Sequence, residues 1–468
     1  MRWRGVTTDP SVGPEIRLDP PATACPPPRD RSTMPSDVAA WRRETLAAFG
    51  IDPDRTVIAT GHQAAIWHPG ILAKDLVVRA IHDRASATGE PTIPLHFIAD
   101  HDANDAGLVR LPALDDADGL PTALGWRLRP AGHGRSTRDR PAGPATAPPP
   151  HRSPIPALGD RIESIRAAVD RHADAESEAM QLGLAAAELA RPLGGDLDRR
   201  SMSRLLQATV GRVLLDRMLA DPAACADAHD AAVEADRDRR ADGGRRRPRG
   251  VARRLRRPGA IELPLWRDTP DGRRPVTVGE PIELDALRPR ALLATALARL
   301  AGCDLFVHGL GGGVYDMVME DWLARWLGPE VRAALAPAIV ATATLRLPLP
   351  LTTIDDPMTP EALHRLRNDP DLGSLEPPTR HTLLAAIDAA PRRSPARRTA
   401  YLALRTAIDD ARRRGADVLA DAERRMADQR RLARSNALAL DRTWAFPLHD
   451  DAALQELRAS ISTAFSRV

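Results

Sequence analysis

One stretch of the sequence, residues 56–105, constrains the fold more than any other. Residues 57–60 are apolar and β-rich, and a helical pattern of apolar side chains starts after Pro69-Gly70. A second apolar run over residues 93–99 ends in the polar triplet Asp100-His101-Asp102. A strand, a polar loop, a helix and a second strand in this order form the crossover unit of parallel sheets. The sequence therefore predicts an α/β fold with a parallel-sheet core.

Polar residues follow each of these two predicted strands at the point where the strand ends. Ligands of open α/β sheets bind outside the carboxyl ends of the strands. If the two strands are neighbours, one crevice receives His62, His68, Lys74, Asp100, His101 and Asp102. We expect catalytic roles for Lys74, His62, His101, Asp100 and Asp102, and binding of a nucleotide or substrate by Thr60, Gly61, Gln63 and His68. The alternative for the triplet is a capping and turn role.

Lys74 is the only lysine in a chain with 66 lysine and arginine residues. Surface charges and salt bridges tolerate the exchange of lysine for arginine, whereas a compact ammonium on a flexible stem is not always replaceable. This lysine lies beside a histidine-containing loop at the start of a predicted helix. We therefore expect it to contact phosphate; the alternative is an ordinary lysine on a helix surface.

A glycine-rich segment, residues 308–316, follows a third apolar run at residues 305–307 and precedes a predicted helix over residues 317–327. Glycines let the backbone approach a ligand, and a helix N-terminus favours an anion. The segment supplies further candidate binding residues: His308, Gly309, Gly311, Gly312, Tyr315 and Asp316. It matches neither common phosphate-binding motif, so a tight strand-to-helix turn is the alternative.

Composition shifts divide the chain into consecutive regions. We expect a disordered tail at residues 1–35, the first half of the core at 36–128, a flexible Pro- and Arg-rich loop at 129–157, a helical insertion at 158–238, an arginine-rich loop at 239–258, the second half of the core at 259–352, a coiled-coil region at 353–442 including one long helix over 396–440, and a C-terminal segment at 443–468 that packs back on the core. The 468 residues suffice for two or three domains.

Composition also excludes several classes of protein. The three cysteines, Cys25, Cys225 and Cys303, have no zinc-site spacing and suggest no disulfide framework, which favours a reducing, cytoplasmic compartment. No apolar run is long enough to cross a membrane, and no secretory signal is recognisable. The arginine-rich loop could attract polyanions, but no aromatic residue interleaves with its arginines, so nucleic acid is not the expected partner.

The residues of both loops resemble those of the bacillithiol biosynthesis cysteine-adding enzyme family. That family carries a Thr-Gly-Gln-Gln loop with a downstream Pro and Lys, and here Thr60, Gly61, Gln63, Pro69 and Lys74 match, while His62 replaces the first Gln. Asp100, His101 and Asp102 match the family's Asp-His-Asp, with Asp105 as the later acid and Ala99 in place of the preceding one. The tail at residues 442–446 and Leu454-Gln455-Glu456 is also similar, so the resemblance spans roughly residues 40–465.

This resemblance implies a Rossmann-like nucleotidyltransferase-type core, a coiled coil that mediates homodimerisation, and a ligase that joins cysteine to an amino-sugar acceptor such as glucosaminyl-malate. Amide formation needs an activated carboxylate, so ATP or another nucleotide is the expected cofactor. We expect Lys74, His62 and His68 to contact the phosphates. Asp100 or Asp102 could hold a divalent metal or orient the attacking amine, and His101 could transfer a proton. A nucleotidyltransferase-like enzyme with another substrate and a non-catalytic, polyanion-binding scaffold are the alternatives.

Overall fold

The computed structural model describes residues 5–7, 13–90, 92–132, 134–242, 252–353, 357–368 and 377–466. The chain forms two compact units. The core unit comprises residues 10–113, 123–347 and 441–468, and the helical unit comprises residues 1–9, 114–122 and 348–440. Every candidate site residue belongs to the core unit.

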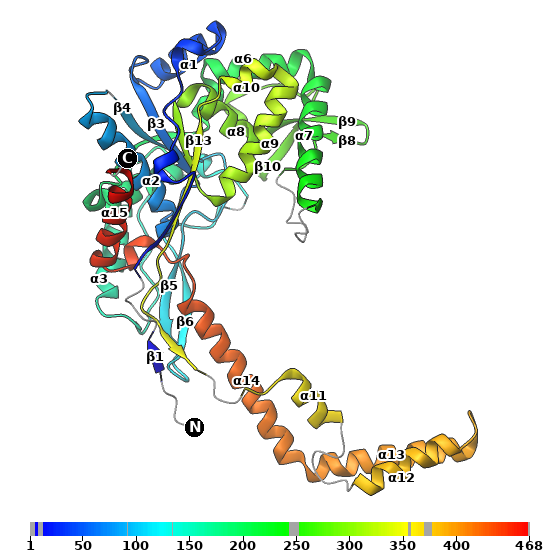
Figure 1. The fold of residues 1–468 in the computed structure, drawn as a ribbon. Coiled ribbons are helices and arrows are strands. Elements are labelled where there is room, and N and C mark those ends of the chain that lie inside the picture. The colour runs from blue at the N-terminus through cyan, green and yellow to red at the C-terminus, as the bar shows by residue number, and fades with distance from the viewer. Residues whose placement is uncertain are drawn as a thin grey trace. The chain divides into compact units, whose positions relative to one another are not determined.

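The core unit is built around a six-stranded sheet with the order β2-β13-β12-β3-β4-β7 (Figure 1). Its strands, in that order, are Glu15–Asp19, Ala338–Thr344, Leu305–His308, Thr56–His62, Thr92–Ile98 and Asp198–Ser201. All neighbouring strands are parallel except β2, which runs antiparallel to β13. The predicted α/β class is therefore confirmed, and β3 and β4 are neighbours, with Thr60 opposite His96.

Helices cover both faces of this sheet because successive residues of β3 enter different apolar clusters. Ile58 shares a cluster with Leu72 of α2 (Pro69–Ala87). Val57 belongs to the other cluster, together with Val318 of α9 (Leu310–Leu327). A strand buried on both faces reads as a continuous apolar run, which is the pattern seen at residues 57–60.

Further helices and smaller sheets follow along the chain outside the central sheet (Figure 1). The helices are α1 (Ser36–Ala48), α3 (Leu158–Arg171), α4 (Glu178–Ala190), α5 (Arg204–Gln207), α6 (Thr209–Ala220), α7 (Pro222–Asp242), α8 (Ala291–Leu297), α10 (Pro329–Ala333) and α15 (Asp451–Ser466). An antiparallel sheet contains β8 (Arg256–Arg257), β9 (Ala260–Thr269), β10 (Gly272–Thr277) and β11 (Leu287–Pro289), and β5 (Leu108–Leu114) pairs with β6 (Pro121–Arg127).

The prediction of a disordered tail over residues 1–35 is wrong for residues 13–35. Strand β2 adds an edge to the central sheet by pairing with β13. Farther along, the buried Arg29 donates to the carbonyls of Leu300 at 2.9 Å and Ala334 at 2.7 Å, and lies 3.4 Å from Asp304. Composition could not reveal either interaction, because both partners lie about 300 residues away in the sequence.

Two other regional predictions need correction. Residues 129–157 are largely irregular, but they pack around the end of β4: the Thr137 hydroxyl donates to the Asp100 carbonyl at 3.0 Å, and Arg140 pairs with Glu178 at 3.0 Å. The helical insertion at 158–238 also contributes β7 to the central sheet, so it is not a separate domain.

The helical unit contains β1 (Gly5–Thr7), paired with β14 (Pro350–Thr352), and four helices. In the described part of this unit the helices are α11 (Pro360–Asn368), α12 (Pro377–Ala389), α13 (Pro395–Arg414) and α14 (Ala416–Ala439). The predicted single helix over 396–440 is divided at Gly415, which has a low helix propensity. Helix α12 packs on α13 and α11 on α14. Residues 243–251 of the arginine-rich loop lie outside the described residues, whereas residues 239–242 end α7 and residues 256–257 form β8.

Candidate functional site

The sheet has a topological switch point between its two central strands, β3 and β12. After β3 the chain enters α2 on one face, and after β12 it enters α9 on the other face. The loops that leave these strands therefore diverge at the carboxyl edge of the sheet. Open α/β sheets bind their ligands at such a point.

Lys74 lies at this switch point, in the second turn of α2. Its ammonium donates to the carbonyl of Gly61, the next-to-last residue of β3, at 2.5 Å. A Cβ on Gly309, after β12, would stand 3.8 Å from the Lys74 Cδ, so the side chain lies between the two loops. Burial, opposed by Asp75 and assisted by Arg199, lowers the pKa of Lys74 to about 8. The chain's single lysine is thus a buried cation with one described hydrogen-bond acceptor.

Two histidines lie near this ammonium, and both are neutral at pH 7. Burial, followed by the nearby Lys74 and His96, holds the pKa of His62 well below its usual value. Burial, Arg442 and Lys74 lower the pKa of His68 to about 4. His68 is also the N-cap of α2, since its Nδ1 accepts from the Gly70 amide at 3.1 Å. One nitrogen of His68 is therefore used by the helix, whereas His62 has a ring that can both donate and accept.

A buried polar network beneath Lys74 was missed in the sequence. His96 of β4 lies 2.7 Å from Asp75 through Nδ1, and Arg199 of β7 pairs with the other Asp75 oxygen at 2.8 Å. All three side chains are buried, and the His96 ring stacks on Trp67 at 4.6 Å. Among the described residues, the His96 Nε2 has no hydrogen-bond partner. The only sequence signal was a histidine in the middle of an apolar run.

This network holds the loop between β3 and α2 in place. The Trp67 indole donates to the carbonyl of Gln63 at 2.8 Å, and its own carbonyl accepts from the Phe446 amide at 2.6 Å. The Arg199 guanidinium lies over the Trp67 ring, 5.4 Å from the ring centre. The position of Gln63 therefore depends on side chains from β4, α2 and β7.

The Asp100-His101-Asp102 triplet does not act as one cluster. Asp100 accepts from the hydroxyls of Ser201 at 2.5 Å and Ser203 at 2.8 Å, and from the Ser203 amide at 2.9 Å. Asp102 points elsewhere: it accepts from the Gln63 amide group at 2.7 Å and lies 3.6 Å from Arg273. Both Asp100 oxygens are engaged, which argues against our catalytic or metal-binding assignment for Asp100. Its contacts instead anchor the end of β4 to Ser201 and Ser203.

His101 and Asp102 follow β4 at the carboxyl edge of the sheet. His101 is 4% exposed, and its Nδ1 has no partner among the described residues. Its carbonyl accepts from Arg273 at 2.9 Å. Arg273, on β10, was not among the candidates because the hairpin that carries it lies about 170 residues along the sequence. It brings a cation to the same edge as Gln63 and Asp102.

Thr60 and Gly61 have structural reasons for their identity. The buried Thr60 hydroxyl donates to the Val307 carbonyl at 2.7 Å and ties β3 to β12. A Cβ at Gly61 would stand 3.0 Å from the Phe97 carbonyl oxygen, closer than side chains ordinarily come. These contacts argue against ligand binding by the Thr60 side chain, and they leave Gly61 as the acceptor for Lys74.

The glycine-rich segment is part of a helix and not a loop. Helix α9 starts at Leu310, seven residues earlier than predicted, and its first intrahelical bond runs from the Gly313 amide to the Gly309 carbonyl at 3.2 Å. The amides of Leu310, Gly311 and Gly312 precede that bond, so they remain available at the helix N-terminus. This is the only part of the segment that suits an anion.

The side chains of this segment are engaged within the core. The His308 Nε2 lies 2.6 Å from Asp316, which also pairs with Arg299 at 2.9 Å. A Cβ at Gly312 would stand 2.3 Å from the His308 ring, so glycine there leaves room for the imidazole. Tyr315 packs against the apolar core. These contacts argue against the predicted ligand-binding roles of His308, Tyr315 and Asp316.

In the described part of the chain, no group of three His, Cys, Asp or Glu side chains is arranged as a metal site. None of the described helices has the length and apolar character that a membrane crossing requires. The chain matches no protein-family model and no curated protein sequence. The switch point, with Lys74, His62, Gln63, Asp102 and the first amides of α9, is thus identified by its own geometry.

Proposed function

We propose that the chain is an enzyme that activates a carboxylate with a nucleotide and joins it to an amine. The family resemblance makes cysteine the expected carboxylate donor and an amino sugar such as glucosaminyl-malate the expected acceptor. One observation carries the proposal: the chain's single lysine is a buried ammonium between the loops that follow β3 and β12. A buried cation is costly unless an anion accompanies it, and a nucleotide phosphate supplies that anion.

The residues of the site have distinct roles in this proposal. At pH 7 the Lys74 ammonium, with a pKa of about 8, is mostly protonated and suits phosphate oxygens together with the first amides of α9. The neutral His62 offers one donor and one acceptor to the substrate. Asp102, positioned by Gln63 and Arg273, suits the attacking amine as a partner or proton acceptor.

The chemistry has two steps. The donor carboxylate attacks a phosphorus atom of the nucleotide, forms an acyl–phosphate bond and releases the remaining phosphates or nucleotide. The amine then attacks the acyl carbon, the acyl–phosphate bond breaks, and the amide forms as the amine loses a proton. Both steps place negative charge on phosphate oxygens, where Lys74 stabilises it.

The helical unit suits a role in assembly. Tyr401 and Leu402 of α13 and Val418 of α14 are large apolar side chains more than half exposed in one chain. A coiled-coil homodimer that covers such residues is part of the proposal.

The test is ligation by the purified protein supplied with ATP, cysteine and glucosaminyl-malate, with mass spectrometry of the cysteinyl adduct. We expect an adduct from the wild type and a loss of at least about 100-fold in Lys74→Ala, the effect of removing one charge-stabilising group. Arg84→Ala, in the last turn of α2, is the matched control and should retain activity.

The other outcomes separate the alternatives. A protein that binds nucleotide but yields no adduct would be a nucleotidyltransferase-like enzyme with a different acceptor. His62, which replaces the first Gln of the family's loop, favours this outcome. A protein that binds no nucleotide and yields no adduct would contradict the enzyme proposal and leave the polyanion-binding scaffold.

A further inference from the structure

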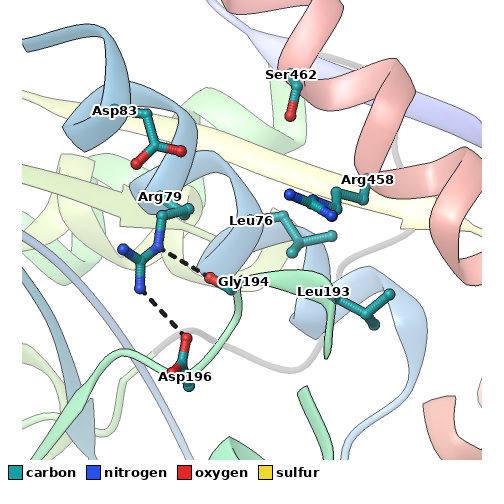
Figure 2. Close-up of a pocket in the computed structure, with 8 residues that line it drawn as sticks. All are labelled: Leu76, Arg79, Asp83, Leu193, Gly194, Asp196, Arg458 and Ser462. Carbon is teal, nitrogen blue, oxygen red and sulfur yellow. Dashed lines mark hydrogen bonds and ion pairs between the residues drawn. The ribbon is translucent and has the colours of Figure 1, made fainter. Parts of the chain in front are cut away.

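A hollow separate from the switch point lies between α2, α15 and the turn before β7. Its volume is about 400 Å³. Figure 2 shows its lining residues: Leu76, Arg79, Asp83, Leu193, Gly194, Asp196, Arg458 and Ser462. Lys74 does not line the hollow. The residues of α2 that do, such as Arg79 and Asp83, lie farther along the helix. The hollow therefore needs an explanation of its own.

Two oppositely charged side chains face this hollow from different walls. Arg458 comes from α15 and Asp83 from α2, and both are exposed (Figure 2). Within the part of the chain that the structure describes, neither forms a hydrogen bond or an ion pair. They do not pair with each other although both border the same space, so each retains its full capacity for a ligand.

The other polar side chains of the hollow are already oriented. Arg79 donates to the Gly194 carbonyl at 3.1 Å and lies 3.3 Å from Asp196, which fixes the turn before β7 against α2. Ser462 lies one helical turn after Arg458 on α15, so its hydroxyl stands on the same face (Figure 2). Arg458 and Ser462 together form a cationic, hydrogen-bonding wall.

The lining of the hollow is mainly polar. Leu76 and Leu193 at its base are almost completely buried, at 3% and 4% exposure, so they offer a ligand little apolar surface. A purely anionic ligand would meet the carboxylates of Asp83 and Asp196 as well as the two arginines. A ligand with a cationic group beside its anionic group satisfies both walls.

We propose that this hollow binds a free amino acid. Its carboxylate pairs with Arg458 and Ser462, and its ammonium pairs with Asp83. Arginine suits a carboxylate because its planar fork can donate two parallel hydrogen bonds. Since both charged side chains are exposed, each contact contributes modestly and binding is weak. The inference is independent of the function proposed for the switch point.

The test is ligand-observed NMR with the full chain and three probes of matched shape. L-leucine carries both charges, 4-methylpentanoate lacks the amine, and 3-methylbutylamine lacks the carboxylate. We expect L-leucine to bind. Each single-charge probe should bind more weakly by a factor of up to about five, because it lacks one exposed ionic contact. Arg458→Met and Asp83→Asn should each weaken L-leucine binding by about the same factor, and Arg43→Met, on exposed α1 surface, should not.

Two results would overturn the inference. The first is no interaction of L-leucine with the wild-type protein at tens of millimolar. The second is equal binding of 4-methylpentanoate and L-leucine with no effect of Asp83→Asn, which would make the hollow a simple anion site. Unchanged circular dichroism of the variants shows that any loss of binding is local, since the substituted side chains are exposed.

Discussion

The polar clusters that follow β3 and β4 look alike in the sequence and differ in the structure. Lys74, which follows β3, has spare capacity because it has one described acceptor; it lies above His96 of β4, whose Nε2 has none among the described residues. After β4, Asp100 has every oxygen occupied by Ser201 and Ser203. A fully satisfied buried carboxylate stabilises a fold, whereas buried groups with spare capacity are expected where a ligand completes the site.

The largest effect that this comparison predicts is on stability, at Asp75. Asp75→Asn removes the charge between Arg199 and His96 and leaves the buried guanidinium without a counterion. We expect the free energy of unfolding to fall by about 3–5 kcal/mol in urea titrations. Asp227→Asn, which breaks the fully exposed pair with Arg256, should lower the free energy of unfolding far less. Equal losses in the two variants would remove the distinction between buried and exposed pairs.

A second prediction concerns the pH dependence of Lys74. Its pKa falls from 10.5 in the unfolded chain to about 8 in the folded protein, so between these values the unfolded state binds more protons. Stability from this group is therefore present above pH 10.5 and is lost as pH falls towards 8, by up to about 3 kcal/mol. The unfolding free energy of the wild type relative to Lys74→Met should rise by that amount between about pH 7 and pH 10.5.

Chemical denaturation of both proteins across this pH range measures the difference directly, and groups shared by the two proteins cancel. A difference that stays constant with pH would show that Lys74 keeps an ordinary pKa. The ammonium would then be better solvated than its 2% exposure indicates.

The smallest of these three predicted effects on stability is at Asp100, in the cluster that follows β4. Asp100→Asn weakens charge-assisted hydrogen bonds from Ser201 and Ser203 and should cost about 1.5–3 kcal/mol. Because both Asp100 oxygens are already engaged by Ser201 and Ser203, the folded variant should retain ligation activity within about threefold. A folded Asp100→Asn protein without activity would show that the two clusters work together after all.

Local patterns in the sequence were sufficient to predict the unit that carries the site. The apolar, β-rich run at residues 57–60 and the helical pattern after Pro69 predicted β3 and α2, and the apolar run at 93–99 predicted β4. These signals are local because the residues that give each helix or strand its period lie within a few positions of one another in the sequence. The start of α9 was misplaced because glycines have low helix propensity, and here packing against the core outweighs that preference.

The rest of the site depends on contacts between distant residues. Asp75 and His96 interact across 21 positions, and Arg273 reaches His101 across 172. A polar residue inside an apolar run looks like an exception to the periodicity, so the sequence did not identify His96 or Asp75 as part of the site. The roles of Asp100 and His308 could not be judged either, because only the positions of Ser201, Ser203 and Asp316 show that these side chains are already paired.

The pairing of β2 with β13 has a consequence for how the chain folds during synthesis. Val340 is made about 320 residues after its partner Asp19, so the edge of the sheet stays open until nearly three quarters of the chain has left the ribosome. Contacts between such distant residues slow folding and expose unpaired strand edges to other chains. A nascent chain truncated before residue 338 would present the open side of β12, a natural place for a chaperone to bind.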